Sequence, residues 1–316
     1  MDPYLSIIIP IYNEEENIPA LWERLSRVMT ESFADPAKPW EIILTDDGSR
    51  DRSLAMLIDI AKAEPRVKVV EFNRNYGQHS AIFGAFAEAR GQIIVTLDAD
   101  LQNPPEEIPK LVAKVEEGFD VVGGWRQGRQ ANDSFFRTMP SKIVNAVTRR
   151  TTGVKLHDYG CMLRAYSRDV VDAMLLCKER SSFIPALANS FAKRITEVPV
   201  AHAERAAGES KYGLWKLINL QFDLLTSFSL LPLQALSVFG VLTAGFGFLL
   251  FLGLVAYRFL HPEGTAQGVF TLFAILFFFV GCQFIAFGLL GEYIGRIYQE
   301  VRDRPRYMVK KVHQTK

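Results

Sequence analysis

The most constraining feature of this sequence is a long apolar region near its carboxyl end. Lysine, arginine, aspartate and glutamate make up 22% of the chain, yet residues 224–291 contain only two of them. Two runs in this region, 233–257 and 268–291, contain none. Each run is longer than the roughly 20 residues that an α-helix needs to cross a bilayer. The sequence therefore predicts a hairpin of two transmembrane helices within 232–291.

Basic residues flank this hairpin on both sides. Lys211 and Lys216 precede it, and a larger set of cations follows it: Arg296, Arg302, Arg304, Arg306, Lys310 and Lys311. Because lysine and arginine gather on the cytoplasmic side of membrane proteins, we expect the preceding domain and both termini to lie in the cytoplasm. Residues 292–316 are expected to form a basic cytoplasmic tail that suits anionic lipid headgroups.

The residues just before the hairpin, 211–231, mix apolar and polar side chains. This pattern predicts an amphipathic helix that lies on the inner leaflet, and the alternative is a helix packed within the soluble domain. The net charge of the chain is only +1, which argues against nucleic acid as a partner.

Residues 1–210 have the pattern of an α/β domain. Short apolar, β-branched runs alternate with amphipathic segments of helical length, which indicates a mainly parallel sheet. The expected strands are 5–10, 41–45, 67–72, 93–97 and 121–123, and the expected helices are 18–32, 53–64, 80–89 and 108–117. Polar loops follow these strands, so we expect the loops to meet at the carboxyl edge of the sheet, where open parallel sheets bind ligands.

The strongest candidate for chemistry is the segment 97–105, LDADLQNPP, which follows the strand expected at 93–97. In an extended turn, Asp98, Asp100 and Gln102 can point the same way and offer oxygen ligands to one hard cation. Such a cation also offsets the repulsion between paired carboxylates. Mg²⁺ or Mn²⁺ bound to a diphosphate is the natural occupant, and the alternative is that the two aspartates only cap the next helix.

Three further loops carry groups that suit a nucleotide-sugar donor. Tyr12 can cover a base, the neighbouring polar groups can bind a uracil or a ribose, and Gly48 permits a tight turn. The loop 73–80 opens a helix, so its backbone amides can meet phosphate. Ordinary turn and capping roles are the alternative for each residue. The candidate donor-binding residues are Pro10, Tyr12, Asn13, Glu14, Asp46, Arg74, Gly77, His79 and Asp98.

The motifs PIYNE at 10–14, DDGS at 46–49 and DAD at 98–100 resemble those of the inverting family-2 glycosyltransferases with the GT-A fold. That family uses a nucleotide-sugar donor and a divalent cation. The cation loop further resembles the polyprenyl-phosphate branch of the family, the relatives of dolichol-phosphate mannose synthase. In that branch the two aspartates and the glutamine are metal ligands, which implies Asp98, Asp100 and Gln102 here, with Asp100 also expected to be catalytic.

A closer resemblance extends over nearly the whole chain. The segments NRNYGQHSA at 73–81, DYGCMLRAY at 158–166, GESKY at 208–212 and LLGEYIGRIY at 289–298 are similar to those of the bacterial undecaprenyl-phosphate 4-deoxy-4-formamido-L-arabinose transferases. This resemblance implies transfer of 4-deoxy-4-formamido-L-arabinose from its UDP conjugate to undecaprenyl phosphate, with inversion, at the bacterial inner membrane. It also implies a role in lipid A modification and polymyxin resistance, and a homo-oligomer that is a tetramer in relatives. The alternative is a polyprenyl-phosphate glucosyl- or mannosyltransferase of the same fold.

The acceptor of such a reaction carries a phosphate whose second pKa is about 6, so its oxygen is already a nucleophile at neutral pH. The harder task is to bring this anion close to an anionic diphosphate, which requires fixed cations. A basic face toward lipid headgroups is the alternative role for each cation. The resemblance implies that Asp158 is a base, or else that it positions acceptor or sugar. The candidate acceptor-phosphate residues are Arg126, Arg129, Arg137, Arg205, Ser210 and Lys211.

Overall fold

The structure is a computed structural model, which describes residues 2–126, 157–158, 160–177, 183–201, 231–260, 267–302 and 304–315. The chain divides into two compact units. Met1–Gln221 and Arg304–Lys316 form the first unit, and Phe222–Asp303 forms the second. The chain thus leaves the first unit, forms the second, and returns to the first.

Within the described residues, the first unit contains one sheet of eight strands in the order β7-β5-β6-β4-β1-β2-β3-β8. Strands β4, β1, β2 and β3 are parallel, and β7 is parallel to β5. Strand β6 is antiparallel to β4 and β5, and β8 is antiparallel to β3. The bounds are β1 Leu5–Ile11, β2 Trp40–Asp46, β3 Val67–Phe72, β4 Ile93–Thr96, β5 Val121–Arg126, β6 Arg164–Ser167, β7 Ile195–Val200 and β8 Val309–His313.

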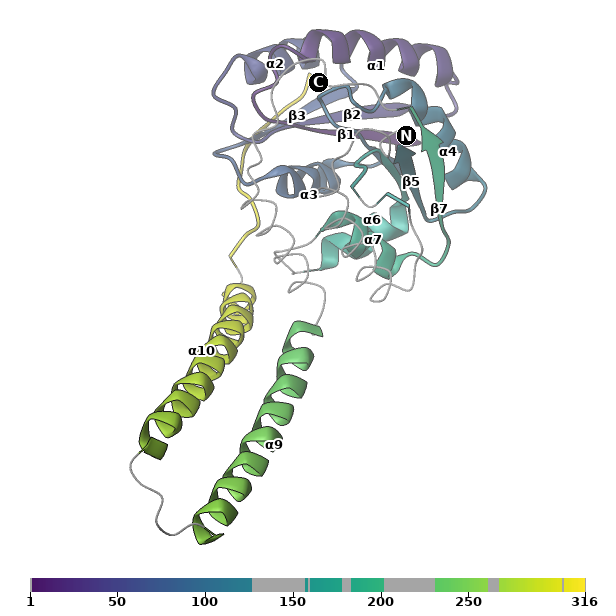
Figure 1. Cartoon of the computed structure of the whole chain (residues 1–316). Helices are drawn as coiled ribbons and strands as arrows, with labels where there is room; N and C mark the ends of the chain where they lie inside the picture. Colours follow the sequence, from purple (N-terminus) through teal and green to yellow (C-terminus); the bar gives the residue numbers. More distant parts are fainter. Residues whose placement is uncertain are drawn as a thin grey trace. The chain divides into compact units, whose positions relative to one another are not determined.

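Helices cover both faces of this sheet (Figure 1). Apolar side chains of α1, α2 and α4 pack against one face, and those of α3, α6 and α7 pack against the other. The structure confirms the predicted α/β fold with a mostly parallel sheet. The bounds are α1 Ile18–Ser32, α2 Ser53–Ala63, α3 Gln78–Glu88, α4 Ile108–Glu116, α6 Arg168–Leu176 and α7 Ile184–Phe191, and the 3-10 turn η1, Pro105–Glu107, precedes α4.

Strand β1 illustrates why the sequence folds in this way. Its side chains alternate between the two faces, so that Leu5, Ile7 and Ile9 join the core on the α1 side and Ile8 joins the core on the α3 side. A strand that is buried on both faces needs an almost continuous apolar sequence. The run LSIIIPI meets this need, and each buried aliphatic side chain contributes about 1.5–3 kcal/mol to stability.

The elements predicted for residues 5–123 are confirmed. The strand at 67–72 and the helix at 18–32 have the predicted bounds, and the other elements differ at their ends by one to three residues. The sequence pattern does not predict β6, α6, α7 or β7. Strand β6 is only four residues long and β7 alternates imperfectly, so neither carries a strong local signal.

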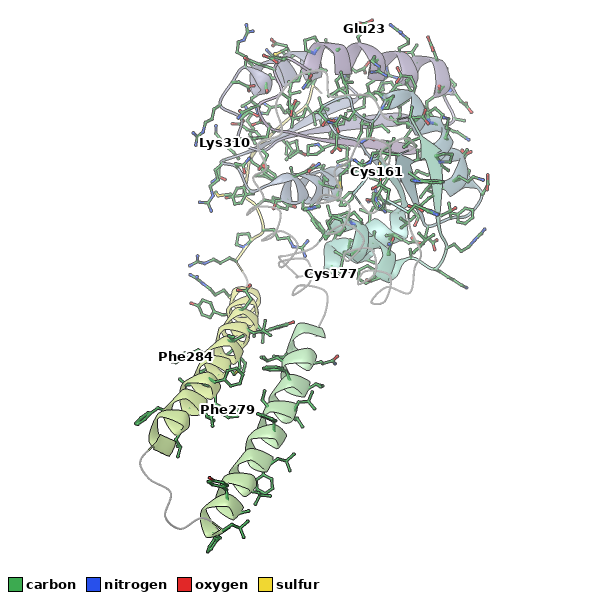
Figure 2. The ribbon with its side chains drawn as sticks, viewed as in Figure 1. Glu23, Cys161, Cys177, Phe279, Phe284 and Lys310 are labelled. Carbon is green, nitrogen blue, oxygen red and sulfur yellow. The ribbon has the colours of Figure 1, made fainter. Side chains whose placement is uncertain are left out.

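The second unit contains two long helices, α9 (Leu231–Leu260) and α10 (Gln267–Val301), which cover the two predicted apolar runs. Phe279 on α10 lies against Gly247 on α9, where an added Cβ would be 2.9 Å from the Cζ atom of the ring. Figure 2 shows Phe279 and Phe284 among the side chains of α10. Phe284 is 70% exposed within this chain. Exposed apolar surface of this kind is typical of a helix that contacts lipid or another protein.

Among the described helices, one segment is long and apolar enough to cross a membrane, Phe278–Gly295 of α10. The apolar segment found in α9, Leu236–Leu249, is shorter. A hairpin that spans the membrane twice therefore stays a prediction. The amphipathic helix expected before α9 lies outside the described residues as far as residue 230.

The end of the chain differs from the basic tail expected at 292–316. Helix α10 continues to Val301, and Val309–His313 then forms β8 beside β3 at the edge of the sheet. The ring of Tyr307 stacks on that of Phe72, with centroids 4.9 Å apart. The two lysines of β8 are exposed, which suits an edge strand that must not pair with another chain.

The side chain of Glu71 on β3 fixes this last strand. One carboxylate oxygen accepts a hydrogen bond from Lys310 Nζ at 2.6 Å, and the other lies 2.9 Å from His313 Nε2. Burial raises the pKa of Glu71, but the hydrogen bonds from Lys310 and His313 outweigh burial and lower that pKa below its usual value. The end of the chain is thus held to β3 by the stacking of Tyr307 on Phe72 and by the contacts of β8 with Glu71.

Candidate active site

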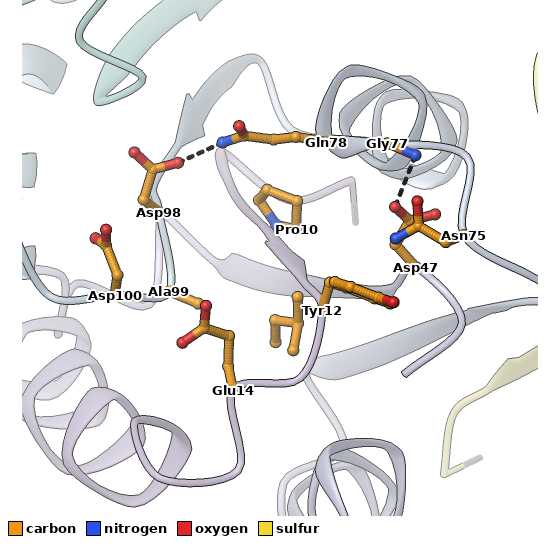
Figure 3. A pocket seen from close by; sticks show the side chains of 11 residues that line it. Pro10, Tyr12, Glu14, Asp47, Asn75, Gly77, Gln78, Asp98, Ala99 and Asp100 are labelled. Carbon is orange, nitrogen blue, oxygen red and sulfur yellow. Dashed lines mark hydrogen bonds between the residues drawn. The ribbon is translucent and has the colours of Figure 1, made fainter. Parts of the chain in front are cut away.

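The loops that follow β1, β2, β3 and β4 meet at a pocket of about 330 Å³, a volume within the range of small-molecule sites. Figure 3 shows Asp98, Asp100 and Glu14 on one side of this pocket and Asp47 and Asn75 on the other. As expected for an open parallel sheet, the pocket lies at the carboxyl ends of the strands. Six candidate residues from the sequence line it: Pro10, Tyr12, Glu14, Gly77, Asp98 and Asp100.

Hydrogen bonds join the loop after β1 to the loop after β2. The backbone N–H of Asn13 donates to Ser49 Oγ at 3.0 Å, and Asn13 Oδ1 accepts from the backbone N–H of Arg50 at 2.8 Å. Asn13 has a φ of 55°, a left-handed conformation that asparagine tolerates better than most residues. The Asn13 side chain therefore helps to hold the two loops together, and its contact with the donor stays a prediction.

Gly48 allows the loop after β2 to approach the loop after β3. Its φ is 70°, and an added Cβ would lie 2.5 Å from the carbonyl carbon of Arg74, which is much closer than real contacts allow. The tight turn predicted at Gly48 is confirmed, and the contact gives a second reason for glycine at this position.

The two aspartates at the end of β2, Asp46 and Asp47, have different surroundings. Asp46 is buried and accepts hydrogen bonds from the backbone N–H of Ser49, and burial raises its pKa. Asp47 lines the pocket, and its two carboxylate oxygens accept hydrogen bonds from the backbone N–H groups of Tyr76 and Gly77 at 2.7 and 2.8 Å. The sequence predicts a donor contact for Asp46 and does not single out Asp47, although both belong to the same motif.

Asp98 is the most strongly perturbed carboxylate of the pocket. Burial raises its pKa to about 7, repulsion from Asp100 adds to this effect, and Arg126 opposes it. Gln78 Nε2 donates a hydrogen bond to Asp98 Oδ1 at 2.6 Å (Figure 3). Gln78 belongs to the motif at 73–81, but the sequence does not predict it as a site residue. The motif alone does not reveal which residue at the start of α3 faces Asp98.

The acidic pair fits a divalent cation. Burial and repulsion from Asp100 penalise the negative charge of Asp98, and a bound cation would offset this penalty. The backbone N–H of Gln102 donates to Asp100 Oδ1 at 3.1 Å, and Gln102 does not line the pocket. Among the described residues there is no group of three or more histidine, cysteine, aspartate and glutamate side chains that could hold a metal ion. Asp98 and Asp100 line the pocket, and the metal-ligand role predicted for them and for Gln102 stays a prediction.

Arg126 and Asp158 form a bidentate ion pair. Arg126 Nε donates to Asp158 Oδ2 at 2.6 Å and Nη2 donates to Oδ1 at 2.9 Å, with side chains 10% and 13% exposed. Burial lowers the pKa of Arg126, but its hydrogen bonds with Asp158 outweigh burial and raise that pKa above its usual value. Arg126 also interacts electrostatically with Asp98, so the structure brings together residues assigned to donor, acceptor and catalysis.

Four of the predicted donor contacts do not line the pocket: Asn13 and Asp46, which are described above, and His79 and Arg74. His79 is directed toward Phe183, with ring centroids 5.7 Å apart, and burial lowers its pKa to about 4. Its neighbour Gln78 faces Asp98 instead, because consecutive residues of a helix point about 100° apart. Arg74 places its guanidinium over the ring of Tyr76, 4.9 Å from the centroid.

Five candidate residues for the acceptor phosphate lie outside the described residues. The structure therefore places Arg126 from that set and leaves the others as predictions from the sequence. These five are Arg129, Arg137, Arg205, Ser210 and Lys211.

Comparison with known proteins agrees with the motifs. The model of glycosyl transferase family 2 matches residues 6–175. Proteins named undecaprenyl-phosphate 4-deoxy-4-formamido-L-arabinose transferase from Klebsiella pneumoniae subsp. pneumoniae and Pectobacterium carotovorum subsp. carotovorum are 54% and 56% identical, over 98% and 97% of this chain and 93% of each relative. These relatives confirm the resemblance predicted from the sequence motifs.

A solved structure supports the fold. The crystal structure of mannosyl-3-phosphoglycerate synthase from Rubrobacter xylanophilus superposes with a TM-score of 0.50 at 12% identity, and the match covers 70% of this chain and 71% of that chain. At this identity the likeness concerns the fold alone. The family match, the close relatives and the pocket at the strand ends together lead to one conclusion: this chain belongs to glycosyl transferase family 2 and is a glycosyltransferase with a GT-A-like fold.

Proposed function

We propose that this protein transfers 4-deoxy-4-formamido-L-arabinose from UDP to undecaprenyl phosphate. The observation that carries the proposal is identity of 54% to 56% over nearly the whole chain to proteins named for that transfer. At this level of identity, the residues that surround the substrates are expected to be largely shared. The pocket at the carboxyl ends of the strands gives the donor a place to bind.

The donor fits this pocket through its nucleotide and its diphosphate. Tyr12 lies in the pocket with 42% of its surface exposed, so its ring is available to cover the uracil. Asp98 and Asp100 would hold Mg²⁺ or Mn²⁺ against the diphosphate. Such a cation supplies charge neutralisation of the UDP leaving group. Glu14, on the same side of the pocket as Asp98 and Asp100, adds a third carboxylate (Figure 3).

The acceptor phosphate attacks the anomeric carbon of the sugar, and the bond to UDP breaks with inversion. At neutral pH this phosphate is already ionised, so it needs little help from a general base. Arg126 interacts electrostatically with Asp98 and would stabilise the phosphate groups that meet beside this residue. Asp158 accepts both hydrogen bonds from Arg126, so we propose that it orients this cation and does not remove a proton.

The remaining features of the proposal follow from the sequence. Arg129, Arg137, Arg205, Ser210 and Lys211 would bind the acceptor phosphate. Helices α9 and α10 would span the bacterial inner membrane, with the amphipathic segment at 211–231 on its cytoplasmic face. A homotetramer and a role in lipid A modification and polymyxin resistance complete the proposed assignment.

A direct test measures UDP release from UDP-4-deoxy-4-formamido-L-arabinose by the purified full chain. The matched acceptors are undecaprenyl phosphate and undecaprenol, which lacks only the phosphate. We expect release with the phosphate and none above background with the alcohol. Equal release with both acceptors would overturn the proposal that the lipid phosphate is the nucleophile.

A further inference from the structure

Three residues lie in one row across neighbouring strands beside the Asp158 segment. Gly123 on β5 pairs with Arg164 on β6 and with Glu197 on β7. An added Cβ at Gly123 would lie 3.5 Å from Arg164 Nη1 and 3.5 Å from Glu197 Cγ, which is ordinary contact distance. The two long charged side chains therefore lie against Gly123 from opposite sides.

Both charged side chains of this row are buried. Arg164 is fully buried, and the side chain of Glu197 is 7% exposed. Burial of a charged group is costly unless hydrogen bonds compensate for the lost water. The partners of these two residues therefore indicate why the fold keeps charges at these positions.

Their hydrogen bonds go to the segment that carries Asp158, mostly to its backbone, and Glu197 Oε2 also lies 2.9 Å from His157 Nδ1. Glu197 Oε2 accepts from the N–H of His157 at 2.7 Å, and Oε1 accepts from the N–H of Asp158 at 3.1 Å. Arg164 Nη2 donates to the carbonyl oxygen of Asp158 at 3.0 Å, and Nε donates to that of Cys161 at 2.9 Å. The peptide groups on both sides of Asp158 are thus held by one acidic and one basic side chain.

We propose that Glu197 and Arg164 are positioning residues of the active site, which fix the backbone of Asp158 so that its carboxylate meets the Arg126 guanidinium in bidentate geometry. The inference rests on the proposed function, in which Arg126 acts on the phosphate groups. A bidentate pair requires both oxygens at defined positions, so a small displacement of the Asp158 backbone breaks at least one of the two hydrogen bonds from Arg126. The chain of contacts runs from Glu197 and Arg164 through Asp158 to Arg126.

The first test uses Glu197→Gln, with Glu71→Gln as the matched control. Glu71 is also a buried carboxylate on a strand of this sheet, but its partners are Lys310 and His313 on β8. We expect Glu197→Gln to lower kcat about tenfold to a hundredfold, because small misplacements of active-site groups have effects of this order. KM for the UDP-sugar should change less than threefold. The control should keep wild-type kcat.

A double variant separates positioning from general destabilisation. If Glu197 acts through Asp158, then Glu197→Gln should lower kcat less than threefold when Asp158→Asn is already present. The positioning role is wrong if the double variant loses the product of the two single-variant losses in kcat. It is also wrong if Glu71→Gln lowers kcat as much as Glu197→Gln does.

A measurement without turnover keeps this inference distinct from the proposed function. Hydrogen exchange of the full chain should be faster in Glu197→Gln for a peptide that contains His157 and Asp158, and unchanged for a peptide that contains Val67–Phe72. Unchanged exchange at His157 and Asp158 would overturn the inference. Failure of the wild-type protein to transfer the sugar, with faster exchange in the variant, would overturn the proposed function and leave the structural inference standing.

Discussion

The guanidinium of Arg126 and the carboxylate of Asp158 face each other in a two-point ion pair, with both N–O distances below 3.0 Å. Arg126 is the last residue of β5, and Asp158 belongs to a segment more than thirty positions later in the chain. Because both oxygens of Asp158 are engaged, its carboxylate is better placed to orient a cation than to accept a proton from a substrate.

This pair predicts the outcome of Asp158→Asn. The amide keeps one acceptor oxygen but presents an N–H group to Arg126, so the orientation of the guanidinium is lost. We expect kcat to fall about tenfold to a hundredfold, with the shape of its pH profile retained. Steady-state kinetics between pH 6 and 9 checks this, with Asp172→Asn, which breaks an exposed pair with Arg168, as the control. Loss of one limb of the profile would instead identify Asp158 as a base.

Asp100→Asn tests the acidic pair. The substitution removes one of the two carboxylates that would hold the divalent cation, so we expect transfer that is sensitive to EDTA to be abolished. Asp59→Asn, at an exposed position of α2 paired with Lys62, should leave transfer unchanged. Wild-type transfer by Asp100→Asn at saturating donor would show that Asp100 is not an essential ligand.

The raised pKa of Asp98 predicts how cation binding depends on pH. Because this pKa is about 7, protons compete with a cation for Asp98 below neutrality. The affinity for Mn²⁺ alone should therefore fall as the pH is lowered from 8 to 6, and binding should release protons. Calorimetry in two buffers of different ionisation enthalpy measures both effects. An affinity that is constant over this range would contradict the perturbed pKa.

Gly48→Ala tests the close approach of the loops after β2 and β3. A left-handed conformation costs an alanine about 1–2 kcal/mol, and the contact with the Arg74 backbone adds to this cost. Gly118→Ala is the matched control, since Gly118 also has a positive φ but meets only the flexible end of Arg194. We expect Gly48→Ala to lower both the melting temperature and the affinity for UDP. If Gly48→Ala and Gly118→Ala lowered the melting temperature and the affinity for UDP equally, the close approach of the two loops would not contribute to stability or to UDP binding.

The sequence predicts the first part of the fold well because the signals there are local. In β1 the apolar run itself specifies a strand buried on both faces, and α1 is marked by apolar residues at helical spacing. Strand β8 has no such signal. Its pairing with β3, from Val69 with His313 to Phe72 with Val309, joins segments that lie far apart in the sequence. Only the return of the chain to the first unit makes this strand possible.

The same distinction holds at the site. Asp98 and Asp100 could be predicted as pocket residues because their spacing occurs directly after a buried strand, and both line the pocket. The contact of Gln78 with Asp98 could not be predicted, because it depends on how α3 is rotated against the sheet. The rotation of α3 also decides the position of His79. The sequence predicts this residue beside the donor, whereas its ring lies near Phe183.

The most direct measurement of the central claim is the identity of the sugar on the lipid product. The purified full chain, in membranes that contain undecaprenyl phosphate, receives equal amounts of UDP-4-deoxy-4-formamido-L-arabinose, UDP-glucose and GDP-mannose with Mg²⁺ or Mn²⁺. Mass spectrometry of the lipid fraction then identifies the sugar that was transferred. The proposed function predicts undecaprenyl phosphate that carries formamido-arabinose alone, and a product that carries only glucose or mannose would contradict it.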